Sequence, residues 1–333
     1  MAMDKHNTSF KYKFENSPLF MSFDVTAACN LSCIHCYNDS GKKYEDELTD
    51  EEAMSVARQI AEFSPVTVCI CGGEPLVRKN LMQIIECVSS AAGSVNMVTN
   101  GLLINEHKVH ELAESGLTAM QVSLDGVNAF QHDILRNCQG SFDKAINAIK
   151  LGKQAGLEIH VAMTPSKLNY RTIEQYVKMC RELGITLARI MPLIPMGRGK
   201  NIEHILLSSE EYLEVQLAVL NANKKYRTDS FYVEWGDPLE HYIRMPLNAQ
   251  ADLNTFQYEI KANGNITVST YIPVVVGNIR KHSLKEYWDA GYKNIWKNQE
   301  LLEYISSIQT IYDVDKLKPT PYSGKYHYIE LID

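Results

Sequence analysis

Short apolar runs alternate with helix-period segments along the first 200 residues of the chain. The apolar runs have the length of strands and occupy residues 19–25, 66–70, 95–98, 119–124, 157–163 and 185–191. Predicted helices cover residues 50–63, 80–92, 106–115, 141–155 and 172–183. Such alternation predicts six βα repeats and a parallel sheet covered by helices. Right-handed crossovers would curl that sheet into an open barrel.

The pattern changes after residue 200. A helical stretch at 208–225 and a strand-like run at 231–235 predict a connector that completes the barrel. Residues 257–262 and 265–270 then alternate at period two around Asn263-Gly264, which favours a β-hairpin. The predicted organisation is an N-terminal segment (1–18), a barrel core (19–205), the connector (206–254) and a small α+β extension of hairpin plus helix (255–333).

Composition excludes several classes of protein. The 333 residues carry a formal net charge of −7, which argues against a nucleic-acid binder because such a protein needs a basic stripe. The chain has neither an apolar signal region at its start nor a long uncharged apolar run. We therefore expect a cytoplasmic protein with no membrane partner, whose thiols stay reduced.

Three of the eight cysteines, Cys29, Cys33 and Cys36, fall within eight residues, and no fourth follows nearby. A cubane iron–sulfur cluster has four irons to ligate, so three thiolates leave one iron open to another ligand. A zinc site would require a fourth Cys or His at its own spacing, and His35 between two of the ligating positions is poorly placed to supply it. Three unpaired buried cysteines that cluster by chance remain the other alternative.

A second motif stands at the end of the strand-like run 66–70. There Cys71 is followed by Gly72-Gly73-Glu74-Pro75. Paired glycines allow a close approach of the backbone to a ligand, and a glutamate can accept a charge-assisted hydrogen bond from an ammonium group. The alternative is an ordinary strand-to-helix turn with a solvated glutamate.

Together, the CX3CX2C spacing and the GGEP segment resemble the radical S-adenosylmethionine (SAM) superfamily. Two later strand ends, Thr99-Asn100-Gly101 and Ser123-Leu124-Asp125-Gly126, resemble the TNG and SLDG segments of that family. The resemblance implies an α/β fold, namely a partial (β/α)6 TIM-like barrel. Ligand sites in barrels of this kind gather at the carboxyl ends of the strands.

The resemblance also implies cofactors and site residues. Cys29, Cys33 and Cys36 would hold one 4Fe–4S cluster. The residues expected to contact SAM are Tyr37, Gly72, Gly73, Glu74, Pro75, Thr99, Asn100, Ser123, Asp125, Arg136 and Arg189. Arg198, in a segment that resembles a PxGR motif, is expected either to meet a carboxylate or to be a solvated loop residue. Cys71 is a candidate hydrogen donor, although buried filler is the favoured role for Cys69 and Cys71.

The order of hairpin, residues 276–279 and residues 283–288 resembles the SPASM or twitch extensions of radical SAM enzymes. Such extensions usually carry cysteines for auxiliary clusters, but Cys180 is the last cysteine in this chain. Thr270 and Tyr271 occupy positions where a cysteine would be expected. We therefore expect an extension that is retained for shape and has lost its cluster ligands.

The implied activity is reductive cleavage of SAM to a 5′-deoxyadenosyl radical, which abstracts hydrogen from a substrate C–H bond. The leading hypothesis for the substrate is a ribosomally made peptide, with an electron donor such as flavodoxin or ferredoxin. One alternative is a tailoring enzyme for a sugar, nucleoside or amino acid in antibiotic or cofactor biosynthesis. A non-catalytic iron–sulfur redox protein is the alternative from another class.

Overall fold

The computed structural model describes residues 17–250, 254–317 and 326–332. Its strands are β1 (Phe20–Thr26), β2 (Thr67–Gly72), β3 (Ser94–Thr99), β4 (Ala119–Ser123), β5 (Glu158–Met163), β6 (Leu187–Ile190), β7 (Tyr232–Trp235), β8 (Gln257–Ile260), β9 (Asn265–Ser269), β10 (Ile272–Asn278) and β11 (His327–Tyr328). The α-helices are α1 (Asp50–Phe63), α2 (Leu81–Ser89), α3 (Glu106–Glu114), α4 (Ala129–Arg136), α5 (Ser141–Gln154), α6 (Ile173–Glu182), α7 (Ser209–Tyr226), α8 (Arg244–Gln250), α9 (Leu284–Asp289) and α10 (Gln299–Ile305).

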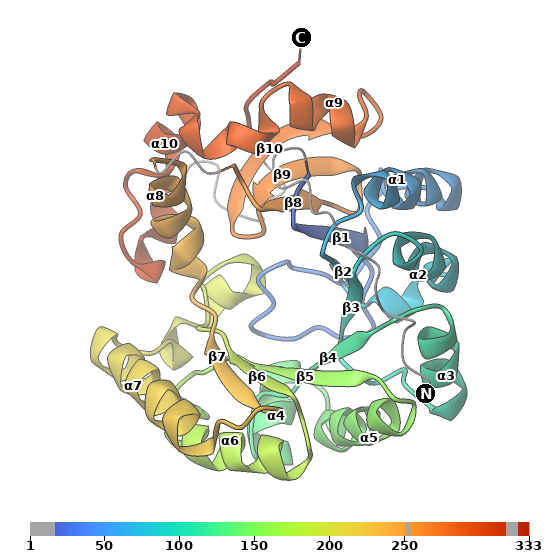
Figure 1. The fold of residues 1–333 in the computed structure, drawn as a ribbon. Helices are drawn as coiled ribbons and strands as arrows, with labels where there is room; N and C mark the ends of the chain where they lie inside the picture. The colour runs from blue at the N-terminus through green and yellow to red at the C-terminus, as the bar shows by residue number, and fades with distance from the viewer. Residues whose placement is uncertain (1–16, 251–253, 318–325, 333) are drawn as a thin grey trace, which may run out of the picture.

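Strands β1 to β7 form a curved parallel sheet in which each strand pairs with the next one along the chain. The helices that connect them cover the outer face of this curve, as Figure 1 shows. The α/β fold with a partial TIM-like barrel is therefore confirmed. Parallel strands bring their carboxyl ends to one edge of a sheet, and the predicted motifs lie at that edge.

The strand-like run predicted at 231–235 forms the seventh parallel strand, β7, which follows α7 and pairs with β6. One feature of the barrel differs from the sequence interpretation. An additional short helix, α4, lies between β4 and α5 and begins at an Asn128 cap. Its eight residues show too little of the helical period to be distinguished from a loop, yet α4 carries Arg136, one of the predicted site residues.

The hairpin of the extension continues the barrel sheet. β8 pairs in parallel with β1, and β9 and β10 follow in antiparallel order. Among the described residues, all eleven strands thus belong to one sheet in the order β11-β10-β9-β8-β1-β2-β3-β4-β5-β6-β7. The sheet runs through the predicted boundary at residue 255, and the division of the chain into domains stays a prediction.

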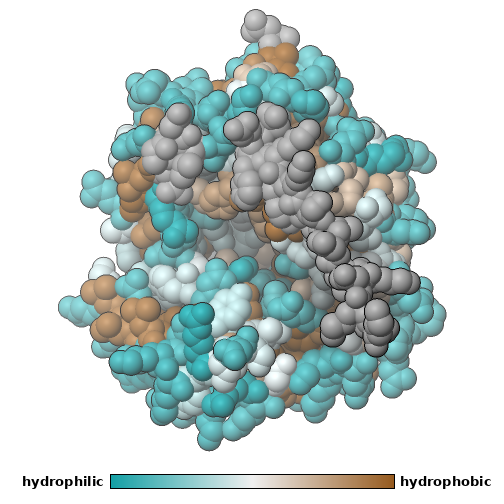
Figure 2. Space-filling model, viewed as in Figure 1, coloured by the Kyte–Doolittle hydropathy of each residue, from teal (hydrophilic) through white to brown (hydrophobic). Residues whose placement is uncertain are grey.

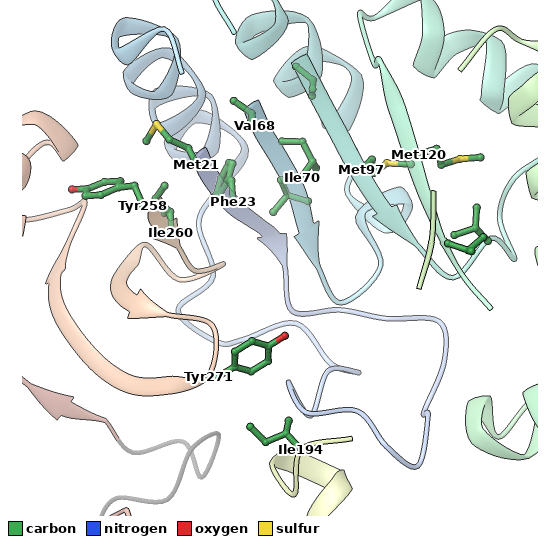
Figure 3. Close-up of a cluster of buried hydrophobic side chains, with 14 of the residues drawn as sticks. Met21, Phe23, Val68, Ile70, Met97, Met120, Ile194, Tyr258, Ile260 and Tyr271 are labelled. Carbon is green, nitrogen blue, oxygen red and sulfur yellow. The ribbon is translucent and has the colours of Figure 1, made fainter. Parts of the chain in front are cut away.

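The apolar core also runs from the barrel into the extension. Met21, Phe23 and Ile70 of the barrel belong to the same buried cluster as Tyr258 and Ile260 of the hairpin (Figure 3). Burial of large apolar side chains is the main stabilising term in folding. The hairpin is therefore held to the barrel by packing as well as by strand pairing.

None of the helices in the described residues is both long enough and apolar enough to cross a membrane.

Candidate functional site

The cysteine loop is the segment from Ala27 to Glu47, which follows β1 at the carboxyl edge of the barrel. Cys33 is buried there, whereas Cys29 and Cys36 are half-buried. The three thiols are near enough to influence one another: burial is the main cause that raises the pKa of Cys29 to about 11, and repulsion from Glu74 and then from Cys33 and Cys36 adds to it. The sequence-predicted ligands thus share one loop.

No three His, Cys, Asp or Glu side chains in the described ranges stand close enough to coordinate a single metal ion. Thiolates that hold a cubane bind three different irons, so they stand further apart than the ligands of one ion. Three thiols on one loop are the donor set that a cubane with one open iron requires. Burial raises the pKa of Cys29 and of Cys33, so metal binding would also remove the protons that burial favours on those two thiols.

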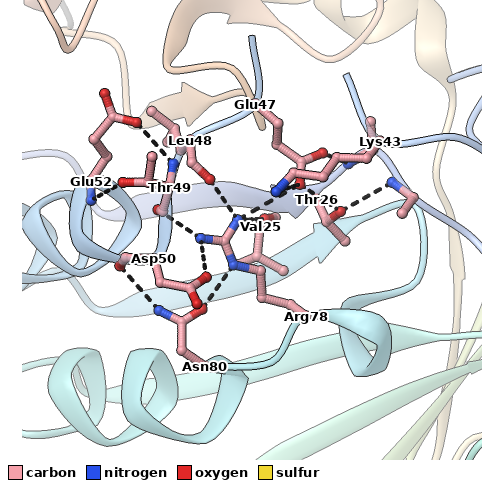
Figure 4. Close-up of polar contacts among 12 residues, drawn as sticks. Val25, Thr26, Lys43, Glu47, Leu48, Thr49, Asp50, Glu52, Arg78 and Asn80 are labelled. Carbon is pink, nitrogen blue, oxygen red and sulfur yellow. Dashed lines mark hydrogen bonds and ion pairs between the residues drawn. The ribbon is translucent and has the colours of Figure 1, made fainter. Parts of the chain in front are cut away.

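The inner side of the cysteine loop is anchored by Arg78 (Figure 4). Its guanidinium donates hydrogen bonds to the carbonyls of Val25 and Leu48 at 3.0 Å each, which joins the end of β1 to the end of the loop. Glu47, 3.7 Å from Arg78, accepts hydrogen bonds from Thr26 Oγ1 and from the amide of Ala27. Sequence reasoning missed Arg78, because nothing in its neighbourhood marks an arginine as buried.

The outer side of the loop is anchored by Arg198, in the 3-10 helix η3 (Gly197–Asn201). Arg198 Nε donates to the carbonyl of Cys33 at 2.8 Å, and Nη1 donates to Asp39 Oδ1 and the carbonyl of Ser40, also at 2.8 Å. Its backbone amide donates to the carbonyl of Cys36 at 2.9 Å. Arg198 therefore does meet a carboxylate, that of Asp39, and it also fixes the backbone at two of the three cysteines.

The Gly72-Gly73 pair packs directly on the start of the cysteine loop. The amide of Gly73 donates to the carbonyl of Thr26 at 2.7 Å, and that of Glu74 donates to the carbonyl of Ala28 at 2.9 Å. A Cβ on Gly73 would lie 2.2 Å from the oxygen of Ala28, and one on Gly72 would lie 2.3 Å from the oxygen of Thr26. Glycine is needed here because two backbones touch.

The Glu74 side chain is fully buried and faces the loop after β3. Its Oε1 accepts from Thr99 Oγ1 at 2.9 Å and from the amide of Leu76 at 3.2 Å, while Oε2 accepts from the amide of Asn100 at 2.8 Å. Burial raises the pKa of Glu74 to about 7, although these hydrogen bonds oppose the shift. The carboxylate thus ties the loops after β2 and β3 together, and its predicted contact with an ammonium group stays a prediction.

Asn100 extends this connection to the cysteine loop. Its side-chain amide donates to Asn30 Oδ1 at 2.7 Å and lies 3.9 Å from Cys29 Sγ. Three of the predicted site segments, those after β1, β2 and β3, therefore meet at one place.

A buried ion pair lies on the other flank of the cysteines. Arg136 Nε is 2.6 Å from Asp125 Oδ2, and Arg136 Nη1 is 3.8 Å from Cys33 Sγ. Burial would raise the pKa of Asp125, but the adjacent guanidinium overcomes it and holds that pKa below its ordinary value. His35, from inside the cysteine motif, joins the group: Nδ1 is 3.0 Å from the carbonyl of Leu135 and Nε2 is 3.7 Å from Asp125. Sequence reasoning named Asp125 and Arg136 but not His35.

The remaining residues predicted to contact SAM are Arg189, Ser123, Pro75 and Tyr37. Arg189 projects from β6 and bonds to Glu234 of β7 at 3.0 Å and to Gln121 of β4 at 3.3 Å, so its guanidinium already has partners in the barrel wall. Ser123 ends β4, and Pro75 begins the 3-10 helix η1 (Pro75–Val77). The ring of Tyr37 lies 5.6 Å from that of Tyr271.

A second cluster of polar side chains comes from β1, β2 and β8 and from Lys261, which directly follows β8. The Cys71 thiol donates to Asp24 Oδ1 at 3.1 Å and lies 3.1 Å from Ser22 Oγ. Lys261 Nζ is 3.2 Å from Asp24 Oδ2 and 3.6 Å from Glu259 Oε2. Burial would lower the pKa of Lys261, but the two carboxylates raise it well above its ordinary value. Cys71 is thus placed in a charged setting that the sequence pattern did not predict.

The comparisons with known proteins agree with this arrangement. The family model described as the radical SAM superfamily matches residues 23–180. Mycofactocin maturase MftC of Mycolicibacterium smegmatis is 31% identical over 306 residues, which cover 89% of this chain and 74% of that protein. The chain belongs to the radical SAM superfamily. Membership confirms the predicted enzyme class and implies a 4Fe–4S cluster and SAM as cofactors.

Two further similarities extend beyond the matched core. AdoMet-dependent heme synthase of Methanosarcina barkeri is 26% identical over 296 residues, which cover 82% of this chain and 83% of that protein. The crystal structure of Streptococcus suis SuiB bound to precursor peptide SuiA superposes with a TM-score of 0.68 at 17% identity, over 89% of this chain and 68% of that one. At that identity the SuiB likeness shows the fold alone.

Proposed function

We propose that this radical SAM enzyme holds one 4Fe–4S cluster through Cys29, Cys33 and Cys36 and modifies a peptide. The observation that carries the cluster assignment is the anchoring of one three-thiol loop on both sides, by Arg78 with Glu47 and by Arg198. A single cluster is proposed because Cys180 is the last cysteine, so the extension offers no thiolate. The flanking Arg136 lies against Cys33, where its positive charge favours a thiolate.

When bound, the cluster and SAM supply a 5′-deoxyadenosyl radical that abstracts hydrogen from a C–H bond of the substrate. The contribution of the chain is to position the bound molecules and to exclude water. The residues proposed to line the SAM site lie at the carboxyl edge of the barrel: Gly72 to Pro75, Thr99, Asn100, Ser123 and Asp125, with Tyr37 next to Cys36 in the chain. Glu74 and Asp125 would act mainly by holding neighbouring loops, since both carboxylates already bond to the protein.

A peptide substrate is supported by what two similar proteins do. MftC is named a maturase, and SuiB is seen with a precursor peptide. Both likenesses extend past the barrel into the segment of this chain that contains the β8–β9 hairpin. A low-potential one-electron donor of the flavodoxin or ferredoxin class, in a reducing cytoplasm, completes the proposal.

A second candidate is a step in cofactor biosynthesis on a tetrapyrrole. It is favoured by the similarity to heme synthase. That similarity covers 83% of the heme synthase, whereas the similarity to MftC covers 74% of MftC. The absence of cysteines after Cys180 does not discriminate between the two substrates.

The test uses the anaerobically reconstituted enzyme with dithionite and SAM. A precursor peptide encoded beside the gene, or a tetrapyrrole precursor of heme, is added in separate reactions, and 5′-deoxyadenosine and the substrate mass are measured. The proposal predicts faster 5′-deoxyadenosine release and a mass change with the peptide only. Turnover with the tetrapyrrole only would assign the second candidate, and no 5′-deoxyadenosine under any condition would indicate a non-catalytic iron–sulfur protein.

A further inference from the structure

Helix α7 has apolar residues on two opposite faces. Val215, Val219 and Ala222 are buried against the barrel. Each of these buried residues has a leucine two positions before it: Leu213, Leu217 and Leu220. Two positions correspond to about 200° around the helix axis, so the leucines lie on the side of α7 that faces away from the barrel. These three leucines are named the leucine stripe here.

The leucine stripe is exposed to solvent. The side chains of Leu213, Leu217 and Leu220 are 57%, 60% and 57% exposed. Figure 2 shows hydrophobic residues gathered over α7, at the lower left of the molecule. Single exposed leucines are common, but a contiguous apolar stripe rimmed by charges marks an interaction surface.

The spacing of the stripe matches helix-to-helix packing. The leucines are separated by four residues and then by three, which is the alternation of core positions in a coiled coil. The helix has 18 residues, so it is about 27 Å long and can carry one such contact over its whole length. The stripe is thus suited to a second helix that lies nearly parallel or antiparallel to α7.

Charges at the two ends of the stripe select an antiparallel copy of the same helix. Glu210 and Lys224 are both exposed, one in the first turn and the other in the last. Each is seven residues from Leu217, so they continue the same face at its two ends. Neither forms an ion pair with the described part of its own chain.

We propose that α7 is a self-association surface, on which two copies of this chain pair antiparallel about a two-fold axis through Leu217. In that pairing Glu210 faces the partner's Lys224, and Leu213 lies about one residue, roughly 1.5 Å along the axis, from the level of the partner's Leu220. The two-fold axis repeats both contacts, so a single stripe supplies its own complement. Antiparallel helices also place opposite ends of their dipoles together.

The contact is small, since one helix from each copy forms it. Interfaces of that size are weak, and we expect a dimer with a dissociation constant on the order of 10 µM. The proposal is independent of the reaction catalysed, because no residue of the stripe belongs to the site.

Sedimentation velocity of the reconstituted enzyme from about 1 to 100 µM tests the proposal. The wild type is expected to shift from the mass of one chain to that of two. Leu217→Asp should stay at the mass of one chain throughout, with an unchanged circular dichroism spectrum. Phe130→Asp is the matched control: Phe130 is 69% exposed on α4 and should leave the dimer intact.

A charge exchange makes the test specific for the antiparallel arrangement. Glu210→Lys and Lys224→Glu should each weaken self-association by roughly threefold to tenfold, because each places like charges together at both ends. Mixing the two variants should restore wild-type affinity, because both ends of the heterodimer again pair opposite charges: the lysine introduced at position 210 of one variant faces the glutamate introduced at position 224 of the other, and the native Lys224 faces the native Glu210. Neither variant creates or buries an apolar group, so failure to fold is not expected to confuse the result.

Three results would overturn the proposal. A wild type that stays at one-chain mass up to 100 µM has no such surface. A dimer that survives Leu217→Asp uses another surface. Protection of α7 amides from hydrogen exchange only after addition of a precursor peptide would assign the stripe to that partner.

Discussion

Lys261 is a buried cation whose partners come from distant parts of the chain. It directly follows β8 and lies between Asp24 on β1 and Glu259 on β8. Breaking a buried ion pair by removing one partner leaves an uncompensated charge, which commonly costs about 3–5 kcal/mol. A methionine would fill the space of the aliphatic stem without supplying the charge.

We therefore predict that Lys261→Met lowers the free energy of unfolding by about 3–5 kcal/mol, as measured by urea denaturation. Lys285→Met is the matched control. Lys285 pairs with Asp289 at 2.6 Å, but both side chains are more than half exposed, and the urea midpoint should not move. Equal midpoints for the two variants would show that the charges around Lys261 are relieved in another way.

His132 is a buried histidine that should make stability depend on pH. Its Nδ1 accepts from the amide of Asp125 at 3.0 Å, and its Nε2 has no partner among the described residues. Burial lowers the pKa of His132 to about 4, and the opposing effect of Asp125 is smaller. Because the unfolded chain takes up this proton near pH 6.5 and the folded chain does not, stability is lost as the pH falls from about 6.5 towards 4.

Between pH 7 and pH 5 this single group should cost about 2 kcal/mol of folding free energy. His132→Asn keeps an acceptor near the Nδ1 position and cannot titrate, so its stability should fall less over this interval. Urea denaturation at the two pH values measures the difference, and His107→Asn, at an exposed histidine, should behave as the wild type does. A slope unchanged in His132→Asn would contradict the assignment. His35, whose pKa is also lowered to about 4 by burial, retains its own contribution in both proteins.

At the scale of elements, the 3-10 helix η3 holds the cysteine loop through the hydrogen bonds of Arg198. Arg198 makes four hydrogen bonds to this loop, including one to the carbonyl of Cys33 and one to that of Cys36. When the side chain is shortened, only the hydrogen bond from the backbone amide of Arg198 to the carbonyl of Cys36 remains. Charge-assisted hydrogen bonds contribute about 1.5–3 kcal/mol each, so the loop should open more often without the guanidinium.

Arg198→Gln should consequently lose iron to a chelator about tenfold faster than the wild type, as followed by the absorbance of the released iron complex. Arg244→Gln is the control, since Arg244 pairs with Glu240 of its own segment rather than with the cysteine loop. Identical rates of iron loss in all three proteins would show that η3 does not hold the loop.

The elements themselves were predicted well where they are long and periodic. The first six strands and the hairpin lie where alternation placed them. The short helix α4 was missed because eight residues hold barely two turns of pattern. Local pattern also could not show that β8 pairs with β1, since these strands are separated by more than 200 residues and either edge of either strand was available.

The same limit applies to the site. Cys29, Cys33, Cys36 and the paired glycines were recognisable because the chemistry requires those residue types at that spacing. The supporting contacts of Arg78, His35 and Lys261 were not, because each connects segments that only the fold brings together. Arg189 was named as a SAM contact, but its pairing with Glu234 could not be predicted, because only the fold places the strand-like run 231–235 beside β6.

At the scale of the whole molecule, one sheet and one core join the barrel to the extension. Phe63 at the end of α1 packs 6.1 Å from both Tyr258 and Trp288, so a barrel helix contacts the hairpin and α9 at once. Asp24 and Lys261 join the two parts through charge. The extension, which has no cysteine, is thus held to the barrel by packing and by ion pairs. Its strand β8 continues the barrel sheet beside β1.

The central claim is that three cysteines hold one cubane whose remaining iron is left for SAM. Its most direct test is iron and sulfide analysis of the anaerobically reconstituted protein, combined with electron paramagnetic resonance before and after SAM is added. The account predicts about four irons per chain, a spectrum that changes with SAM, and loss of both in Cys33→Ala. About eight irons per chain, bound zinc, or a spectrum indifferent to SAM would contradict it.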